Sequence, residues 1–485
     1  MSEVVSGARR RPLLLLVLLA FAQFLIAVDY NIVYVALPAI GRDLGFTAQS
    51  LQWVVSAYAV GFGGFLLLGG RAVDRLGQRR MFVLALAIYA LASLAGGLAT
   101  GPGMLVAARA VQGLGGALLT PATLGLITSA FTEGPARNRA LGVWGAAGSF
   151  GLAAGALLGG VLTNYAGWEW VLLINVPLAL LAVPAALALL PGDVPRPDGA
   201  GGFDVPGALL ATAGSTLLVL GLVSGPEAGW ATPRAAGALG AGVVLLALFV
   251  LVEWRGRNPL APLHMFGNAS LTSAMAVILA YQISLGGTYY LFTTYVQTVL
   301  GYDALRAGLA FLPLALTSML AAGQIVPRVI ARWGVRATLF TGMVTTGLSV
   351  GVLTAGMSVG GSFLAVLPGL VLYGLTAGST FVTMFTAAAT GVATGEEGVA
   401  SALATTSQQI GGALGLAVLV AIANAGLAAD APPGQVLDGI RTAGLTAGAI
   451  TVIGAFFALL LKKPKATHNN DSAPTDLHDP LSAAP

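Results

Sequence analysis

The chain has 485 residues, of which 56% are apolar, 9% are charged and 67 are glycine, with a formal net charge of +4 and a mean hydropathy of +0.86. Because soluble domains carry about a quarter charged residues and about 7% glycine, this composition excludes soluble, fibrous and disordered proteins and indicates a polytopic membrane protein. Cysteine is absent, and the three histidines (His264, His468 and His478) lie outside the apolar segments, which excludes disulfides and a buried cysteine or histidine metal site.

Apolar segments long enough to cross a bilayer as helices, which takes about 20 residues, recur fourteen times along the chain. The first six cover residues 13–39, 51–69, 81–100, 104–131, 140–164 and 170–191. After a polar link over 192–205 come 207–225 and 234–254, and after a second link over 255–270 come 271–299, 305–327, 337–358, 362–392, 399–424 and 441–461. The sequence therefore predicts an all-α membrane protein with fourteen transmembrane helices.

The distribution of Lys and Arg orients these helices in the membrane. If the N-terminus is cytoplasmic, 18 of the 23 basic residues fall in cytoplasmic segments, 4 fall in outer segments and Arg109 lies inside a span. Cytoplasmic loops of membrane proteins are enriched in Lys and Arg. We therefore expect both termini on the cytoplasmic side of a bacterial cell membrane. The same loops account for the pI near 9.4 without a nucleic-acid partner.

A short repeat divides the chain into two halves. The pattern R-x-G-x-R occurs at residues 75–79 and again 257 positions later at 332–336, each time after the second helix of a six-helix set. Transporters are commonly built from such repeats. The predicted organisation is a cytoplasmic N-terminus (1–12), an N-terminal six-helix bundle (13–191), a linker with two inserted helices (192–270), a C-terminal six-helix bundle (271–461) and a disordered cytoplasmic tail (462–485).

Asp29 and Arg109 are the ionisable residues expected inside the spans. At a rise of 1.5 Å per residue, Asp29 lies roughly 15 Å and Arg109 roughly 8 Å from the outer side, a difference that an arginine side chain can bridge. An ionisable group in hydrocarbon is costly and is by default a functional candidate. We interpret Asp29 as an acid whose proton binding depends on Arg109 or substrate. A static ion pair that joins two helices is the alternative.

Polar and aromatic side chains within the spans are candidates for lining a substrate cavity, and interhelical hydrogen bonding is their structural alternative. The main candidates are Asn31, Tyr34, Gln52, Tyr58, Gln112, Trp144, Tyr281, Gln282, Tyr289 and Gln408. A wider set adds Gln23, Trp53, Asn175, Gln297 and Gln409. The chain has no G-x-x-x-x-G-K-[ST] phosphate loop, and no histidine in a span to complete a Ser/His/Asp triad. We therefore expect a protein that is not an enzyme and has no cofactor.

Two groups of residues are candidates for conformational gating. The first lies in the loop after the second span and consists of Gly70, Asp74, Arg75, Gly77 and Arg79. There, an acid beside a glycine turn is expected to cap or pair with a neighbouring helix end. The second consists of Gly151, Gly155 and Gly159, whose four-residue spacing places them on one helix face where two backbones can approach closely.

The sequence resembles the major facilitator superfamily, specifically its fourteen-span drug:proton antiporter branch, over about residues 12–461. Residues 70–80 are similar to the loop motif G-x-L-a-D-R-x-G-R-R/K, and residues 105–117 (LVAARAVQGLGGA) to the fourth-span motif l-x-x-x-R-x-x-q-G-x-g-a-A. Residues 29–38 (DYNIVYVALP) resemble the first-span motif D-x-T-x-V-N-V-A-L-P. The departures from these motifs are Ala72, Gln78, Asn31 and Tyr34.

Two further positions depart from the family pattern. Ala156 stands where the fifth-span motif G-x-x-x-G-P-x-x-G-G has proline, although its glycines are kept. Glu169 replaces arginine in the W-R-W sequence before the sixth span, which reverses a charge on the outer face. These departures bear on antiport behaviour and on substrate entry or release.

The resemblance implies two six-helix bundles that rock about a central cavity and export amphipathic drugs, antibiotics or endogenous metabolites in exchange for protons. It assigns proton transfer to Arg109, the first-span acid to Asp29 and the gating-loop acid to Asp74. The expected partners are a small-molecule substrate, protons and the lipid bilayer, with the chain working as a monomer. The alternatives are export or flipping of a lipid-like substrate, uptake of a solute such as a sugar, and a receptor or scaffold that transports nothing.

Overall fold

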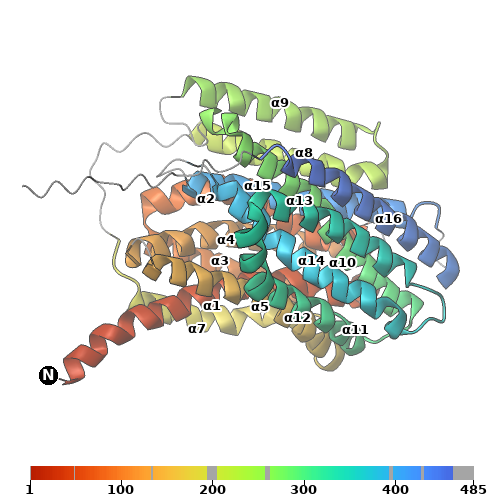
Figure 1. The fold of residues 1–485 in the computed structure, drawn as a ribbon, viewed down its shortest axis with the longest axis horizontal. Helices are drawn as coiled ribbons and strands as arrows, with labels where there is room; N and C mark the ends of the chain where they lie inside the picture. The colour runs from red at the N-terminus through yellow and green to blue at the C-terminus, as the bar shows by residue number, and fades with distance from the viewer. Residues whose placement is uncertain are drawn as a thin grey trace, which may run out of the picture.

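The computed structural model describes residues 2–47, 50–132, 135–193, 205–256, 263–390, 392, 397–427 and 431–461. Within these ranges the chain is almost entirely helical and contains no strand (Figure 1), which confirms the predicted all-α class. The predicted disordered tail, 462–485, and most of the first polar link, 192–205, lie outside the described residues.

The N-terminal half forms seven α-helices in the described residues. They are α1 (Ser2–Leu44), α2 (Trp53–Leu76), α3 (Gln78–Gly97), α4 (Pro102–Ala130), α5 (Pro135–Tyr165), α6 (Trp170–Leu173) and α7 (Asn175–Leu189), with a 3-10 turn, η1 (Ser50–Gln52), before α2. The short α6 and α7 together occupy the sixth predicted span and are separated by a break at Ile174. The two inserted helices are α8 (Val205–Ala228) and α9 (Pro233–Arg255).

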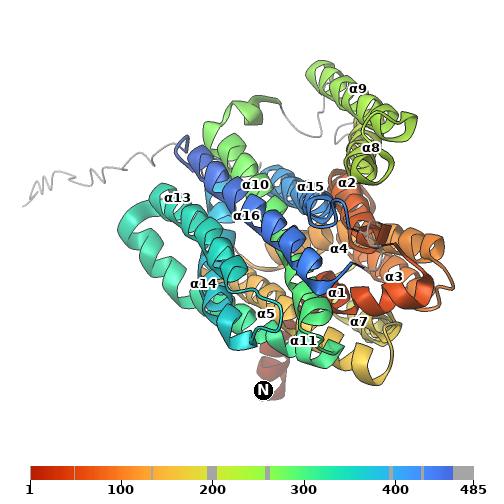
Figure 2. The same ribbon diagram turned by 90° about the vertical axis from the view of Figure 1, so that its right-hand side faces the viewer.

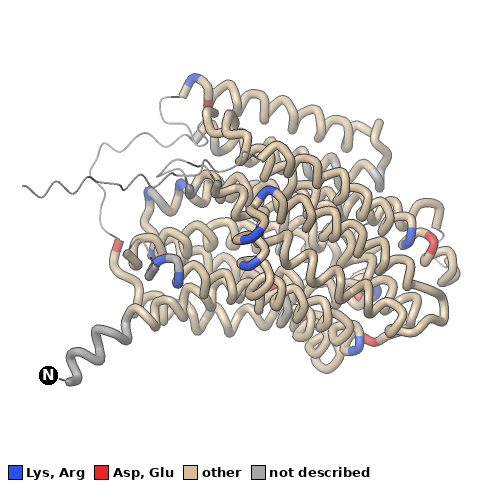
Figure 3. Tube along the Cα trace, viewed as in Figure 1, with Lys and Arg blue, Asp and Glu red and all other residues tan. Residues whose placement is uncertain are grey.

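The C-terminal half begins with a 3-10 turn and continues through helices, two of which contain π-helical turns. The elements are η2 (Leu263–Gly267), α10 (Ala269–Thr294), η3 (Tyr295–Val299), α11 (Ala304–Ala310), α12 (Leu312–Leu320), η4 (Ala321–Ile325), α13 (Val326–Ala355), α14 (Phe363–Ala389), α15 (Glu397–Ala423) and α16 (Pro433–Ala458). Most of the chain trace carries no charge, and Lys, Arg, Asp and Glu gather mainly at helix ends and connecting segments (Figure 3).

Each of the fourteen predicted segments coincides with a helical segment. Eleven helices of the described residues are long and apolar enough to cross a membrane. One of them, Ala304–Ala355, spans 52 residues and is broken at Gly334, while the shorter apolar stretches Ser50–Leu66 and Leu209–Leu218 match the second and seventh predicted spans. The helices are therefore as expected, and the number of membrane crossings stays a prediction.

The two R-x-G-x-R copies adopt the same kind of backbone turn. Gly77 separates α2 from α3 at φ 102°, and Gly334 breaks α13 at φ 75°. These positive φ values are readily adopted by glycine and are strained for residues with a side chain. The repeat therefore marks equivalent helix breaks in the two halves of the chain.

Glycines on α5 bring its backbone against α1. A Cβ atom at Gly155 would lie 2.5 Å from the carbonyl oxygen of Val28, and one at Gly151 would lie 2.7 Å from that of Phe24. A Cβ at Gly159 would overlap the carbonyl oxygen of Ile32 in the same way. Because Cβ atoms do not approach other atoms this closely, these positions accept only glycine without a shift of α1. The close contact at these three glycines fixes the part of α1 that carries Asp29.

The two halves meet on two sides. On one side α2 packs against α15, and on the other α5 packs against α11 and α12. The close approach of α5 to α11 again uses glycines, since a Cβ at Gly160 would lie 2.6 Å from the carbonyl oxygen of Ala304, and a Cβ at Gly308 would lie 2.7 Å from that of Ala156. Ala156, which departs from the family motif, therefore lies at this junction between the halves.

The inserted helices lie at the edge of the molecule, with α9 outermost (Figures 1 and 2). α9 packs mainly against α8, whereas α8 contacts both α2 and α15. The hydroxyl of Thr212 on α8 donates a 2.7 Å hydrogen bond to the carbonyl oxygen of Gly64 on α2. The insertion thus covers the line where α2 and α15 meet.

We expect substitutions on the outer face of α9 to leave transport intact. Val243 and Val244 are 58% and 57% exposed, so alanine at both positions removes no contact with the bundles. Transport per molecule of membrane-inserted protein should equal that of wild type. The matched control is Gly242→Leu, because a Cβ there would lie 2.7 Å from the backbone nitrogen of Leu218 and would force α9 from α8. Loss of all transport in the alanine variant at normal expression would contradict a peripheral role.

Candidate functional site

Asp29 of α1 and Arg109 of α4 form a fully buried ion pair. The Arg109 Nη1 nitrogen lies 2.7 Å from the Asp29 Oδ2 oxygen, and the two side chains are 1% and 0% exposed. The two residues expected from the sequence to approach each other are therefore in contact. Since the desolvation of two charges is expensive, such a pair is stable only when further hydrogen bonds satisfy the remaining polar atoms.

Two amide side chains complete the site around the carboxylate. Gln112 Nε2 donates to Asp29 Oδ1 at 2.8 Å and to the Ser93 hydroxyl at 2.9 Å, while its Oε1 accepts from Arg109 Nη1 at 2.7 Å. Asn175 Nδ2 also donates to Asp29 Oδ1, at 2.8 Å. Three donors thus converge on one carboxylate, an arrangement that complements its ionised form.

The helix α4 presents Arg109 and Gln112 on one face because the two residues are three positions apart. Gly113 lets this face approach α2, since a Cβ there would overlap the carbonyl oxygen of Tyr58. The approach brings Arg109 Nε within 2.9 Å of the carbonyl oxygen of Val54 and the guanidinium carbon within 4.5 Å of the centre of the Tyr58 ring. The arginine is thus held by an ion pair, hydrogen bonds and a cation–π contact.

A row of aromatic rings leads from this site into the C-terminal bundle. The ring centres of Tyr58 and Tyr30 are 6.4 Å apart, and those of Tyr30 and Tyr34 are 6.3 Å apart. Tyr34 then lies 5.7 Å from Tyr289, which stacks on Phe311 at 5.3 Å. Because Tyr34 belongs to α1 and Tyr289 to α10, the row crosses from one half of the molecule to the other.

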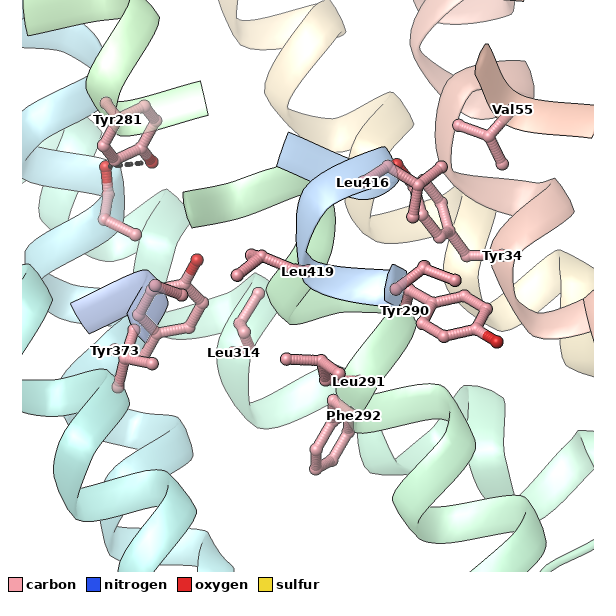
Figure 4. Close-up of a cluster of buried hydrophobic side chains, with 14 of the residues drawn as sticks. Tyr34, Val55, Tyr281, Tyr290, Leu291, Phe292, Leu314, Tyr373, Leu416 and Leu419 are labelled. Carbon is pink, nitrogen blue, oxygen red and sulfur yellow. Dashed lines mark hydrogen bonds between the residues drawn. The ribbon is translucent and has the colours of Figure 1, made fainter. Parts of the chain in front are cut away.

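Several predicted cavity residues are used for packing between helices. Asn31 Nδ2 donates to the carbonyl oxygen of Leu152 at 2.7 Å and so joins α1 to α5. The Tyr281 hydroxyl donates to the carbonyl oxygen of Ala377 at 3.0 Å. Tyr281 and Tyr34 belong to the same large cluster of buried side chains, part of which is shown in Figure 4.

Other predicted cavity residues carry polar atoms that are buried without a hydrogen-bond partner in the described part of the chain. They are Gln52 Oε1, Gln282 Oε1 and Trp144 Nε1. Tyr289 and Gln408 are half-buried. Polar atoms that are buried and unsatisfied call for a partner such as a water molecule or a ligand.

The glycine turn after α2 is held by an acid that the sequence did not indicate. Asp193 accepts hydrogen bonds from the backbone nitrogens of Arg79 at 2.9 Å and Arg80 at 3.0 Å. A carboxylate at this position caps the positive end of the α3 dipole. A side chain at Gly77 would overlap the Asp193 carboxylate. The cap at the start of α3 thus comes from a residue 114 positions away from Arg79 in sequence.

The remaining predicted gating residues differ in their surroundings. The Arg79 guanidinium donates to the carbonyl oxygen of Leu187 at 2.6 Å, and Arg75 is exposed. A Cβ at Gly70 would meet no atom within 4 Å, so close packing does not require glycine there. Asp74 lies in α2, but its side chain is outside the described part of the structure.

Glu253 is a second buried acid, in the last turn of α9, where it is 3% exposed. From the sequence, Glu253 is expected in a cytoplasmic loop, because it lies at the end of the apolar segment 234–254. Asp29 therefore remains the acid in the middle of a predicted span, while Glu253 is buried at a helix end.

Helices that are long and apolar enough to cross a membrane, together with a buried carboxylate–guanidinium pair, are typical of membrane transporters. The model of the Major Facilitator Superfamily matches residues 19–416, and the chain belongs to that family. The predicted family is therefore confirmed.

Curated relatives of the chain include an antibiotic export protein and an antibiotic resistance protein. The chain is 39% identical to the cephamycin export protein CmcT of Amycolatopsis lactamdurans, over 85% of each protein. It is also 39% identical to the puromycin resistance protein pur8 of Streptomyces alboniger, over 85% of this chain and 82% of the relative. Among solved structures, a D-xylose–proton symporter matches with a TM-score of 0.66 and 13% identity over 93% of this chain and 98% of that one, a likeness of fold.

Proposed function

We propose that this protein exports amphipathic drugs, antibiotics or endogenous metabolites from the cytoplasm in exchange for protons. The observation that carries the proposal is the Asp29–Arg109 pair, buried at 0% and 1% exposure with three donors on one carboxylate. An exchanger needs a group whose charge changes as the protein alternates between its two faces, and Asp29 is that group. The names of the relatives, an export protein and a resistance protein, support the direction of transport.

The geometry supports a simple coupling step. While Asp29 is ionised, it holds the Arg109 guanidinium at 2.7 Å. A proton entering from the outer side neutralises the carboxylate, which removes its attraction for Arg109. The guanidinium, which also contacts the Tyr58 ring, is then free to shift that ring and the aromatic row beyond it. Release of the proton to the cytoplasm restores the pair.

The aromatic row supports a site for the substrate between the bundles. Tyr30 and Tyr289 are half-buried members of that row, and their rings offer flat apolar faces with a polar edge. The contact of Tyr34 with Tyr289 joins the halves, as does a 2.9 Å hydrogen bond from Gln297 Nε2 to the carbonyl oxygen of Val35. These contacts must separate when the cavity opens to the outer side. The mechanism needs one chain and no cofactor.

Transport by purified protein tests the function. A panel of antibiotics in a host that lacks its own pumps identifies a substrate, and proteoliposomes with an imposed pH gradient then measure its movement. For a one-to-one electroneutral exchange, each pH unit supports about tenfold accumulation of substrate. Accumulation should collapse when a protonophore removes the gradient. No resistance to any compound, together with no proton flux on addition of compounds from the panel, would contradict the proposal.

The same proposal places both termini on the cytoplasmic side, with fourteen spans between them. Tags inserted after Arg196 and fused at the C-terminus should then be inaccessible to impermeant labels on intact cells. Both should become labelled after the cells are permeabilised. A tag in the outer loop after Ala228 serves as the positive control. Labelling of either cytoplasmic tag on intact cells would overturn this topology.

A further inference from the structure

The amide of Asn175 has one end bound to Asp29 and one end unpaired. Asn175 is the first residue of α7, directly after the break at Ile174, and it is 0% exposed. Its Nδ2 donates to Asp29 Oδ1 at 2.8 Å. Its Oδ1 is buried and has no hydrogen-bond partner in the described residues. Since buried polar atoms are normally paired, this orphan acceptor beside the buried acid requires an explanation.

The three side chains that donate to Asp29 differ in what they can do when the acid takes up a proton. Arg109 has only donors and cannot accept a hydrogen bond from a neutral carboxyl group. Gln112 is held at both ends, because its Oε1 accepts from Arg109 at 2.7 Å and its Nε2 also donates to Ser93 at 2.9 Å. The Oδ1 of Asn175 has no such restraint. Asn175 alone among the three can turn its acceptor towards Asp29 without breaking another hydrogen bond.

We propose that Asn175 is a positioning residue whose side-chain amide rotates when Asp29 gains or loses a proton. Its Nδ2 donates to the ionised carboxylate, and after a half-turn about the last side-chain bond its Oδ1 accepts from the neutral carboxyl group. The terminal torsion of asparagine is broad and roughly two-fold, so both positions are accessible. Each state keeps one hydrogen bond to Asp29 and leaves one amide atom unpaired. The proton is thus accommodated with no net loss of hydrogen bonds at this residue.

This inference rests on the proposed role of Asp29 in proton coupling. In the described part of the chain, Asp29 interacts electrostatically with Arg109 of α4, Tyr58 of α2 and Tyr89 of α3. Asn175, from α7, adds no charge of its own. Its substitution therefore changes the hydrogen bonding of Asp29 without changing the charges around it.

The test is the pH dependence of proton release on substrate addition by purified Asn175→Leu. Leucine is similar in size to asparagine and forms no hydrogen bond. The ionised carboxylate then loses a charge-assisted bond, which is worth more than the neutral bond lost by the carboxyl group. The variant should therefore keep its proton up to a higher pH. The midpoint of the pH dependence of proton release should move to higher pH by about one unit. Asn175→Gln, which keeps both ends of an amide, should move the midpoint back towards wild type.

Infrared spectroscopy separates this role from simple packing. The carbonyl stretch of neutral Asp29 should move to higher frequency in Asn175→Leu, because its hydrogen bond is lost, and Asp29→Asn should delete the band and so assign it. The matched control is Asn424→Leu, the same substitution in the C-terminal half, which should change neither the midpoint nor the band. If Asn175→Leu does not purify, Asn175→Ala gives the same comparison.

The possible outcomes distinguish the role of Asn175 from the proton-coupling role of Asp29. A wild-type midpoint and an unmoved band in folded Asn175→Leu overturn the role of Asn175 while leaving proton coupling by Asp29 in place. Normal proton release by Asp29→Asn overturns the coupling role itself. An alkaline midpoint together with a shifted band supports the amide rotation.

Discussion

Asp29→Asn should abolish proton-driven efflux. Asparagine has nearly the shape of aspartate but cannot carry a negative charge or exchange a proton, so it imitates the protonated state at every pH. The Arg109 guanidinium would lose the partner that it holds at 2.7 Å. In proteoliposomes with an acidic interior, where protons leave as substrate enters, accumulation of substrate should fall to the level of empty vesicles. Substrate binding and downhill exchange should persist, because the aromatic row is unchanged.

The control for this variant is the same substitution at an exposed acid. Asp303 caps α11 and is 53% exposed, in a loose pair with Arg306 at 4.0 Å. Asp303→Asn should therefore pump as the wild type does. Undiminished pumping by Asp29→Asn would mean that another acid carries the coupling role. Glu133 and Glu169, the latter directly before α6, would be the next to test.

Arg109→Ala should have the second large effect, on both stability and coupling. The substitution removes the ion pair, the 2.7 Å bond to Gln112, the 2.9 Å bond to the Val54 carbonyl and the contact with Tyr58. Removing one partner of a buried pair typically costs about 3–5 kcal/mol, because an uncompensated charge stays behind. Thermal unfolding in detergent should show a large loss of stability. Proton exchange should also stop, because the cation that pairs with the ionised Asp29 carboxylate is gone.

Two further variants separate the loss of charge from the loss of shape. Arg109→Lys keeps the charge but lacks the planar fork that reaches Asp29 and the Val54 carbonyl together, so it should be intermediate in stability and transport. Asp29→Asn combined with Arg109→Gln removes both charges, and it should recover much of the stability but none of the coupling. Full proton-driven transport in Arg109→Ala would contradict the pair mechanism.

The helices and the main ion pair were predictable from the sequence for local physical reasons. In a bilayer, the backbone polar groups of a spanning segment must form hydrogen bonds within its own helix. Long apolar segments therefore predict helices. A lone acid in the middle of such a segment is expensive, which singled out Asp29 and its nearest buried cation, Arg109. The glycine spacing on α5 likewise indicated a close helix contact, and α1 is the helix that it meets.

The partners of these residues depended on the packing of helices that are distant in sequence. Asn175 reaches Asp29 across 146 positions, and Asp193 caps α3 across 114. Which face of α7 turns inward is set by its contacts with α3 and α1, not by its nearly uniform apolar sequence. The row from Tyr34 to Tyr289 arises in the same way, because it needs the two halves to meet. Hydropathy and motif spacing determine where the helices are, whereas the rotation of each helix about its axis, which only the packed structure sets, decides what surrounds Asp29.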